Sequence, residues 1–248
     1  SAVVLEQEQH LAYHASGRSA ASFIIDYGNL TTRILNQSSL EYLKKDSCVL
    51  SDRGLMVLSK KSDKIEFINS CKSLGLVQIS VSDAFKKLPI INESMVSYTG
   101  YRDDVYDLDT SKLIDKFVRE AKKNGCKFIR MEKVEKISFR NRVWTINTQK
   151  NQYRSSLLVN AAGPWVDTIC KLAGIGPLGL KAFRRSMARI PAPNSYPVAS
   201  WPFISGPKED WYAKPDAGQL IISPSEEVLT DPHDAWADDL TLAEGIAR

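Results

Sequence analysis

The sequence predicts an α/β protein, α+β overall, in which one domain is built on a parallel sheet and a second on an antiparallel sheet. Three observations carry this prediction. A short β-branched run over residues 2–5 ends at Glu6, as a strand of a parallel sheet does. Residues 109–125 form an amphipathic helix of the kind that crosses between parallel strands. After Gly174 prolines recur too often for helices or for a parallel core.

The N-terminal part begins with the strand over residues 2–5, which we expect to be buried, and a loop to residue 15. Two helical stretches follow, near residues 19–25 and over 30–44. Residues 48–101 read as a separate mixed unit, whose strands we expect at 55–58 and 76–79 and whose helices we expect at 63–73 and 82–88.

The helix over 109–125 has an N-cap at its start and Asn124-Gly125 at its end. One face is apolar, formed by Leu113, Ile114, Phe117, Val118 and Ala121. Strands are expected at 126–130, 134–139 and 143–148, with a hairpin turn at 140–142. An apolar strand at 157–159 then leads into Asn160-Ala161-Ala162-Gly163-Pro164, and a helix beginning at Pro164 stops at Gly174.

Composition excludes several classes of protein. Of the 248 residues, 43% are hydrophobic and 25% are charged, which is the ordinary globular range and not that of a disordered chain. The 33 Lys and Arg residues are interspersed with 29 Asp and Glu residues, so no basic stripe for nucleic acid is present. No apolar run is long enough to span a membrane. The four cysteines lie far apart in apolar stretches, which favours reduced, buried thiols and a cytoplasmic, soluble protein.

The first chemical signal lies near the N-terminus. An acidic residue at the end of a strand, here Glu6, accepts hydrogen bonds from ribose hydroxyls in dinucleotide-binding folds. The small residues of Ser16-Gly17-Arg18-Ser19-Ala20-Ala21 allow a ligand to approach the backbone, and Arg18 adds a positive charge suited to a pyrophosphate. Taken singly, Glu6 also fits a solvated strand end, and the loop fits a flexible Ser/Gly segment that caps a helix.

The second signal is Val159-Asn160-Ala161-Ala162-Gly163-Pro164-Trp165-Val166-Asp167. A strand that runs directly into Ala-Ala-Gly leaves no side chain between a ligand and the backbone, and the following helix turns its positive end toward that gap. A plain strand-to-helix turn is the alternative.

These segments, in this order and spacing, resemble the FAD-dependent oxidoreductases of the D-amino-acid oxidase, glycine oxidase and sarcosine oxidase superfamily. The resemblance implies a Rossmann-like FAD-binding domain over residues 1–45 and 106–178, and an antiparallel-sheet substrate domain over 46–105 and 179–248. Within the latter, residues 179–185 and 211–215 are similar to substrate-domain strands. The family's Gly-rich loop would precede this chain and its C-terminal segment would follow residue 248, so we expect the FAD-binding domain to be incomplete and the isolated chain to bind FAD poorly.

The resemblance also implies roles for individual residues. Glu6 would bind the adenosine ribose, Val134 would contact adenine through its backbone, and Trp165 would close over the cofactor. The remaining residues implied to contact FAD are Ser16, Gly17, Arg18, Ser19, Ala20, Ala161, Ala162 and Gly163. Tyr212 is the residue of this chain suggested for substrate anchoring. The sequence identifies no catalytic residue and no metal site, because His10 and His14 lie in a loop without a third histidine nearby.

The implied reaction is oxidation of a small amine, a D-amino acid, a glycine-like substrate or a 2-hydroxy acid, with hydride transfer from Cα to flavin N5. The substrate and the electron acceptor are not specified by the sequence. Two other functions remain open at this point: an NAD-linked dehydrogenase, which would share the Glu-ended strand, and a non-catalytic remnant of the FAD fold or an assembly subunit.

Overall fold

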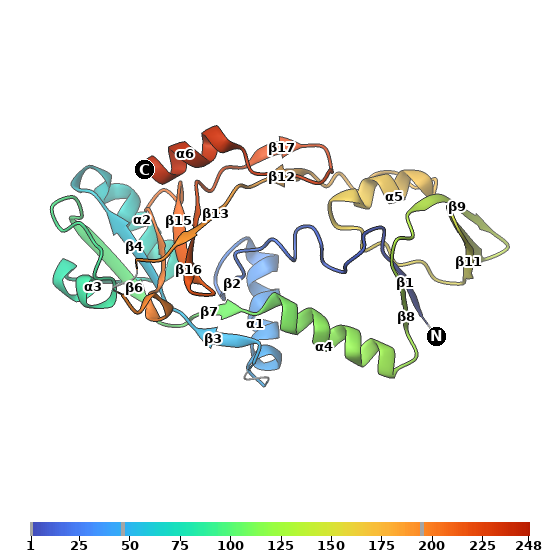
Figure 1. Cartoon of the computed structure of the whole chain (residues 1–248), viewed down its shortest axis with the longest axis horizontal. Helices are drawn as coiled ribbons and strands as arrows, with labels where there is room; N and C mark the ends of the chain where they lie inside the picture. Colours follow the sequence, from blue (N-terminus) through green and yellow to red (C-terminus); the bar gives the residue numbers. More distant parts are fainter. Residues whose placement is uncertain (1, 46–47, 194–195) are drawn as a thin grey trace. The chain divides into compact units, whose positions relative to one another are not determined.

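The computed structural model describes residues 2–45, 48–193 and 196–248. The chain divides by its contacts into two compact units, both discontinuous in sequence (Figure 1). The first comprises Ser1–Ser19, Thr110–Phe183 and Leu229–Ala235, and the second comprises Ala20–Asp109, Arg184–Val228 and Trp236–Arg248. Residues 20–45, expected with the FAD-binding domain, thus make their contacts in the second unit. The boundary expected at residue 46 lies outside the described residues.

The first unit holds a parallel strand pair and a small antiparallel sheet. Its elements are β1 (Val3–Leu5), α4 (Thr110–Lys123), β8 (Lys127–Ile129), β9 (Val134–Arg140), β10 (Val143–Thr148), β11 (Gln152–Ser155), a 3-10 turn (Gly163–Trp165) and α5 (Val166–Leu172). Strand β1 pairs in parallel with β8, with Val4 opposite Phe128. The order of the antiparallel sheet is β11-β10-β9. Two further strands, β12 (Ala182–Arg184) and β17 (Val228–Thr230), lie where the chain passes between units.

The predicted hairpin turn between β9 and β10 is confirmed. Its central residues, Asn141 and Arg142, have φ angles of 51° and 62°. Positive φ at both positions is the geometry whose twist matches that of the paired strands. On the strands, Ile137 lies opposite Ile146 and both are buried, so this pair forms the core of the small sheet.

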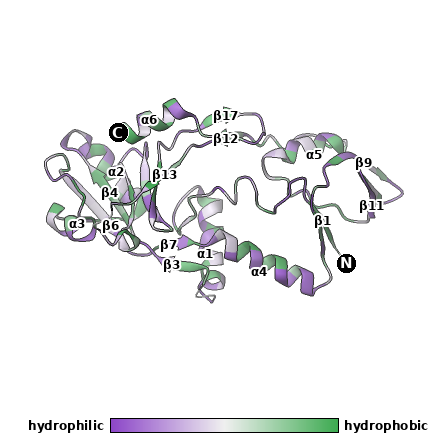
Figure 2. Ribbon diagram, viewed as in Figure 1, coloured by the Kyte–Doolittle hydropathy of each residue, from purple (hydrophilic) through white to green (hydrophobic). Residues whose placement is uncertain are grey.

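Helix α4 confirms the predicted amphipathic helix. Hydrophobic and hydrophilic residues divide between its sides (Figure 2). The helix ends at Lys123, Gly125 follows with a φ of 78°, and the Cys126 N–H then donates to the Ala121 carbonyl. The helix therefore leads directly into β8, as a crossover to a parallel strand requires.

Three local expectations were wrong. Residues 19–25 are not helical: Ala21 has a φ of 54°, which a right-handed helix cannot accommodate, and β2 (Ser22–Ile24) pairs with β7 (Val105–Leu108) instead. Residues 157–159 form no strand, because no neighbouring strand pairs with them and two of their apolar side chains are exposed. Strand β1 is parallel as predicted but not buried, since only β8 lies beside it among the described residues.

The second unit is built on a seven-stranded sheet with the order β13-β16-β15-β14-β4-β6-β5. All neighbouring pairs are antiparallel except β14 and β4, which are parallel, so the predicted antiparallel domain is confirmed with one parallel pair. A smaller sheet has the order β2-β7-β3. The remaining elements are α1 (Leu30–Lys44), β3 (Leu50–Asp52), β4 (Leu55–Ser59), a 3-10 turn (Lys61–Asp63), α2 (Lys64–Leu74), β5 (Val77–Ile79), α3 (Val81–Lys87), β6 (Tyr98–Arg102), β13 (Ala188–Pro191), a 3-10 turn (Val198–Ser200), β14 (Phe203–Ser205), β15 (Tyr212–Asp216), β16 (Gln219–Ser223) and α6 (Asp239–Ala247).

Strand β4 separates two hydrophobic cores because alternate side chains point to opposite faces of a sheet. Met56 packs with Leu88 of the segment that ends α3. Leu55 and Val57 pack on the other face with Phe67 of α2. Helices thus cover both faces of this part of the sheet, which explains why β4 is apolar without alternation.

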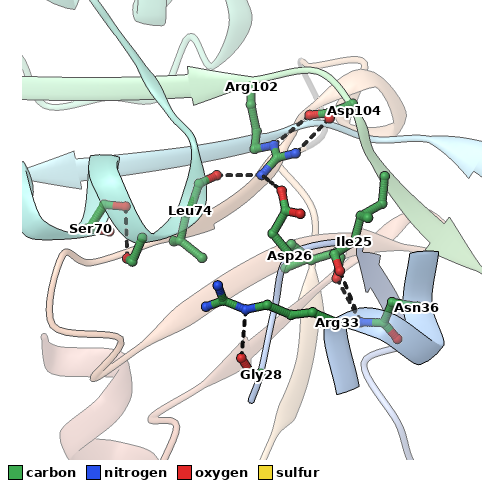
Figure 3. A network of polar contacts seen from close by, with 11 residues as sticks. Ile25, Asp26, Gly28, Arg33, Asn36, Ser70, Leu74, Arg102 and Asp104 are labelled. Atoms are coloured by element: carbon green, nitrogen blue, oxygen red, sulfur yellow. Dashed lines mark hydrogen bonds and ion pairs between the residues drawn. The ribbon is translucent and has the colours of Figure 1, made fainter. Parts of the chain in front are cut away.

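Arg102, at the end of β6, ties three segments of the second unit together (Figure 3). Its Nε and Nη2 lie 2.5 and 2.7 Å from the two carboxylate oxygens of Asp104. Its Nη1 donates to Asp26 (3.1 Å) and to the Leu74 carbonyl (2.5 Å). The hydrogen bonds with Asp104 raise the pKa of Arg102 and lower that of Asp104. The side chain is only 9% exposed, so this guanidinium is a structural centre of the unit.

None of the cysteines forms a disulfide, and all four lie among the described residues. Only Cys170 is buried; Cys48 is exposed, so the expectation of four buried thiols was wrong.

Among the described helices, none is long and apolar enough to cross a lipid bilayer.

Candidate cofactor site

Glu6 lies at the carboxyl end of β1, beside the end of β8. Its N–H donates to the Ile129 carbonyl and its own carbonyl accepts from the Glu132 N–H, both at 2.9 Å. One carboxylate oxygen accepts from the Glu8 N–H at 2.9 Å. The carboxyl edge of parallel strands is where α/β sheets bind ligands. The carboxylate is therefore held at that edge by the backbone that follows it.

Val134 begins β9 close to this edge. It is half-buried and lies opposite Thr148, where the register of β9 and β10 shifts.

Two residues before Val134, the buried Glu132 accepts a hydrogen bond from Asn151 at 2.6 Å. A hydrogen bond with Thr148 is the main reason why the pKa of Glu132 lies below its usual range, and the hydrogen bond from Asn151 lowers it further. Glu132 was missed by the sequence reasoning, because a lone acidic residue before a strand carries no signal of burial.

The loop after β1 folds back on itself. The Arg18 N–H donates to the His14 carbonyl at 3.1 Å. A Cβ on Gly17 would lie 2.2 Å from the Ala12 carbonyl oxygen, so only glycine allows this close approach. The loop residues predicted to contact FAD, Ser16 to Ser19, are exposed.

His14 brings together three segments of the first unit. Its ring lies 4.6 Å from the Trp165 ring between centroids, at an interplanar angle of 53°. Its Nε2 lies 3.1 Å from a carboxylate oxygen of Glu8, and its Nδ1 lies 4.0 Å from Asp234. The structure thus places the loop beside the start of α5. Sequence reasoning considered His14 only as a metal ligand and missed this contact, because nothing in the local pattern indicates the partner Trp165.

Arg18 makes an ion pair with a distant part of the chain. Its Nη2 lies 2.5 Å from Asp234, and its Nη1 donates to the Ala235 carbonyl at 2.9 Å. The hydrogen bond from Arg18 is the main reason why the pKa of Asp234 lies below its usual range. The side chain of Tyr13 lies against the guanidinium: the Cζ atom of Arg18 is 4.8 Å from the centroid of the Tyr13 ring.

The Ala-Ala-Gly turn is ordered by the asparagine before it. The Asn160 side chain accepts from the Ala162 N–H at 3.3 Å and donates to the Val166 carbonyl at 2.9 Å. Gly163 has a φ of 54°, and a Cβ there would meet no atom within 4 Å. Ala161 and Gly163 are exposed. The backbone of the turn is therefore accessible at Ala161 and Gly163.

A cavity of about 570 Å³ adjoins the start of α5. Its lining includes Pro164, Asp167, Thr168, Lys181, Thr230 and Pro232. The Asp167 carboxylate accepts the N–H groups of Leu178 and Gly179, at 2.8 and 3.1 Å, and so fixes the chain that returns past this cavity.

Two of the predicted site residues belong to the second unit. The Ala20 carbonyl accepts from Lys214 Nζ at 2.7 Å, and the same ammonium lies 2.7 Å from Asp107. Tyr212 is buried and stacks on Phe203 at 5.2 Å between ring centroids. Burial is the main reason why the pKa of the Tyr212 hydroxyl is raised.

The residues of the first unit fit the FAD that the sequence resemblance implies. Glu6 provides a hydrogen-bond acceptor of the kind that ribose hydroxyls need, at the carboxyl edge of a parallel strand pair. The open space beside Gly163 leaves the backbone of its turn accessible to a ligand. Trp165, the residue expected to close over the cofactor, is held by His14 from the same loop that follows Glu6.

Comparison with solved structures shows a shared fold. L-proline dehydrogenase from P. horikoshii superposes with a TM-score of 0.81 at 17% identity, over 99% of this chain and 68% of that one. Glycine oxidase from Geobacillus kaustophilus gives a TM-score of 0.74 at 15% identity, over 99% of this chain and 70% of that one. L-amino acid deaminase from Proteus vulgaris gives 0.71 at 15% identity, over 100% and 65%. The chain thus spans about two thirds of the length of these proteins.

Comparison with protein families is more specific. Residues 1–248 match the family described as DAO, FAD dependent oxidoreductase. The match favours FAD over the nicotinamide cofactor that the Glu-ended strand left open. It extends over the whole chain, and the chain therefore belongs to the DAO family of FAD-dependent oxidoreductases, enzymes whose cofactor is FAD.

Proposed function

We propose that the protein oxidises a small amine, an amino acid or a related 2-hydroxy acid. Family membership supports the reaction class. The structural neighbours include proteins named for L-proline, glycine and L-amino acids, which supports an amino acid as substrate. FAD, when bound, supplies the acceptor for the hydride that leaves the substrate Cα.

The single observation that supports this proposal best is the contact between His14 and Trp165. It joins the loop that follows Glu6 to the Ala-Ala-Gly turn, so two segments implied by the family resemblance meet in one unit. In the proposed site, the Glu6 carboxylate accepts hydrogen bonds from the adenosine ribose, Val134 contacts adenine through its backbone, and the backbone of the turn lies against the cofactor.

The remaining proposed roles concern orientation. Holding a substrate in a fixed position provides much of the rate enhancement in such reactions, so the chain need not supply a prominent acid or base. Tyr212 is proposed to contact the substrate. Burial raises the pKa of its hydroxyl, and a hydrogen bond with Ser223 and the positive charge of Arg185 partly offset that rise.

The experiment uses the protein expressed from its intact gene. Purified protein is mixed with D- and L-amino acids, glycine derivatives, secondary amines and 2-hydroxy acids, and turnover is followed with oxygen and, separately, with a redox dye. We expect one of these substrate classes to be oxidised and the preferred acceptor to emerge from the same assay. A protein that holds FAD but oxidises none of them with either acceptor would contradict the proposed activity.

A matched pair of variants tests the cofactor site itself. Glu6→Ala should weaken FAD binding about tenfold to a hundredfold, the effect of losing a hydrogen bond to a charged group. Glu135→Ala removes the same charge from an exposed position on β9 and should leave FAD binding unchanged. Equal FAD affinity of the two variants would contradict the role of Glu6.

A further inference from the structure

The guanidinium of Arg18 already has partners within the protein. Two of its nitrogens contact the segment Leu229–Ala235: Nη2 pairs with the Asp234 carboxylate and Nη1 donates to the Ala235 carbonyl. The face of the group lies over the Tyr13 ring. Two of the five N–H donors that a guanidinium offers are thus compatible with these contacts, and the Tyr13 ring lies against the group, so the protein itself fixes where Arg18 points.

Asp234 in turn contacts the loop at more than one point. Its second carboxylate oxygen lies 3.4 Å from the Tyr13 hydroxyl, and its first lies 4.0 Å from His14 Nδ1. The pKa of Asp234 is lowered, mainly by the hydrogen bond from Arg18, so the carboxylate stays ionised at neutral pH. One carboxylate thus faces Tyr13, His14 and Arg18, all of the loop after β1.

These contacts continue to the proposed cofactor site. His14 lies between Asp234 on one side and Glu8 on the other, and its ring packs against Trp165. Movement of the loop would therefore change both the position of Trp165 and the path of the chain that leaves Glu6.

We propose that Arg18 is a positioning residue and that Asp234 is its partner: together they fasten the loop over residues 11–18 to residues 231–235, and Arg18 does not bind the FAD pyrophosphate. The inference rests on the proposed function, because it assigns how this loop serves FAD binding. Asp234 is thereby a further residue of the site, one that lies far from the loop in sequence.

The first test measures FAD affinity on the protein expressed from its intact gene. Arg18→Ala and Asp234→Ala should each weaken FAD binding, by similar factors of about two- to fivefold, because the pair is 38% and 42% exposed. The double variant should be no weaker than either single one, and the exchanged pair Arg18→Asp with Asp234→Arg should recover most of the affinity. Arg154→Ala and Glu135→Ala, at exposed positions outside both segments, are matched controls that should have no effect.

A pyrophosphate-binding role for Arg18 gives a different pattern. Arg18→Ala would then weaken FAD binding strongly. Asp234→Ala would instead tighten FAD binding, because it removes an anion that competes for Arg18. The exchanged pair would not recover the affinity. Any of these three results would overturn the proposal. The visible spectrum of bound flavin gives a second readout, which should shift alike in the two single variants and return in the exchanged pair.

A flavin-independent measurement keeps the inference separate from the proposed function. Amide hydrogen exchange of residues 11–18 in apo-protein should rise in both single variants and fall again in the exchanged pair. If the wild type holds no FAD, the proposed function fails while this measurement still tests the contact. Unchanged exchange in Asp234→Ala would overturn the contact itself.

Discussion

The rings of His14 and Trp165 lie 4.6 Å apart between centroids, and His14 Nε2 lies 3.1 Å from Glu8. This pair connects the loop after β1 with the start of α5 inside the first unit. It explains how a polar, exposed loop is kept beside a turn of small residues. The consequences for binding and stability can be measured residue by residue.

Replacement of His14 by alanine should destabilise the first unit by about 1–2 kcal/mol, because an aromatic contact and a hydrogen-bonded partner of Glu8 are both lost. His14→Phe should retain much of this stability, since it keeps a ring against Trp165. Urea unfolding followed by tryptophan fluorescence measures both. His10→Ala, at an exposed position, is the control. Equal stability of His14→Ala and His10→Ala would refute the structural role.

Gly17→Ala should disrupt the loop. The added methyl carbon would lie 2.2 Å from the Ala12 carbonyl oxygen, a backbone atom that cannot move aside alone. We expect a loss of FAD affinity of about tenfold or more, as for other strained substitutions in tight turns. Gly176→Ala, where a Cβ meets no atom within 4 Å, should bind FAD as the wild type does. Titration of apo-protein with FAD, followed by flavin fluorescence, distinguishes the two.

Arg102→Met should destabilise the second unit by about 1–2 kcal/mol, because the Leu74 carbonyl loses its donor and the partly exposed carboxylates of Asp26 and Asp104 lose the cation they share. Arg119→Met, on the exposed side of α4, should change stability by less than about 0.5 kcal/mol. The measurement is the midpoint of urea unfolding at neutral pH. A small effect of Arg102→Met would mean that the network does not organise this unit.

The same network predicts how stability depends on pH. Hydrogen bonds from Arg102 lower the pKa of Asp104 in the folded state. The contribution of this carboxylate is therefore complete above its unfolded pKa of about 3.9 and is lost as the pH falls through the lower, folded value. Asp104→Asn should be less stable than the wild type at neutral pH, and the difference should shrink in acid. A difference that stays constant from pH 7 to pH 3 would contradict this, and exposed Asp103→Asn serves as control.

The parts of the fold that were predictable are those that local patterns determine. The apolar face of α4, the helix over residues 30–44 and the tight turn at Asn141 each depend on residues close together in sequence. Strand β2 was not predictable in this way. A left-handed backbone at Ala21 and pairing with β7 override a stretch that could also be helical.

The candidate site shows the same division. Glu6 and the Ala-Ala-Gly turn could be proposed from the sequence because an acidic strand end and small residues before a helix have direct chemical meaning. The pairing of Arg18 with Asp234 could not, because nothing local indicates which of many carboxylates a guanidinium meets after folding. The burial of Glu132 likewise follows from Asn151, which the hairpin brings beside it.

The central claim, that the first unit contributes a FAD site through Glu6, is tested most directly by the cofactor content of the protein expressed from its intact gene. Mass spectrometry of the released cofactor, with the visible absorption of the native protein, is the measurement. We predict stoichiometric FAD in the wild type and in Glu135→Ala, and depleted FAD in Glu6→Ala. A colourless wild-type protein that takes up no FAD on reconstitution would contradict the account.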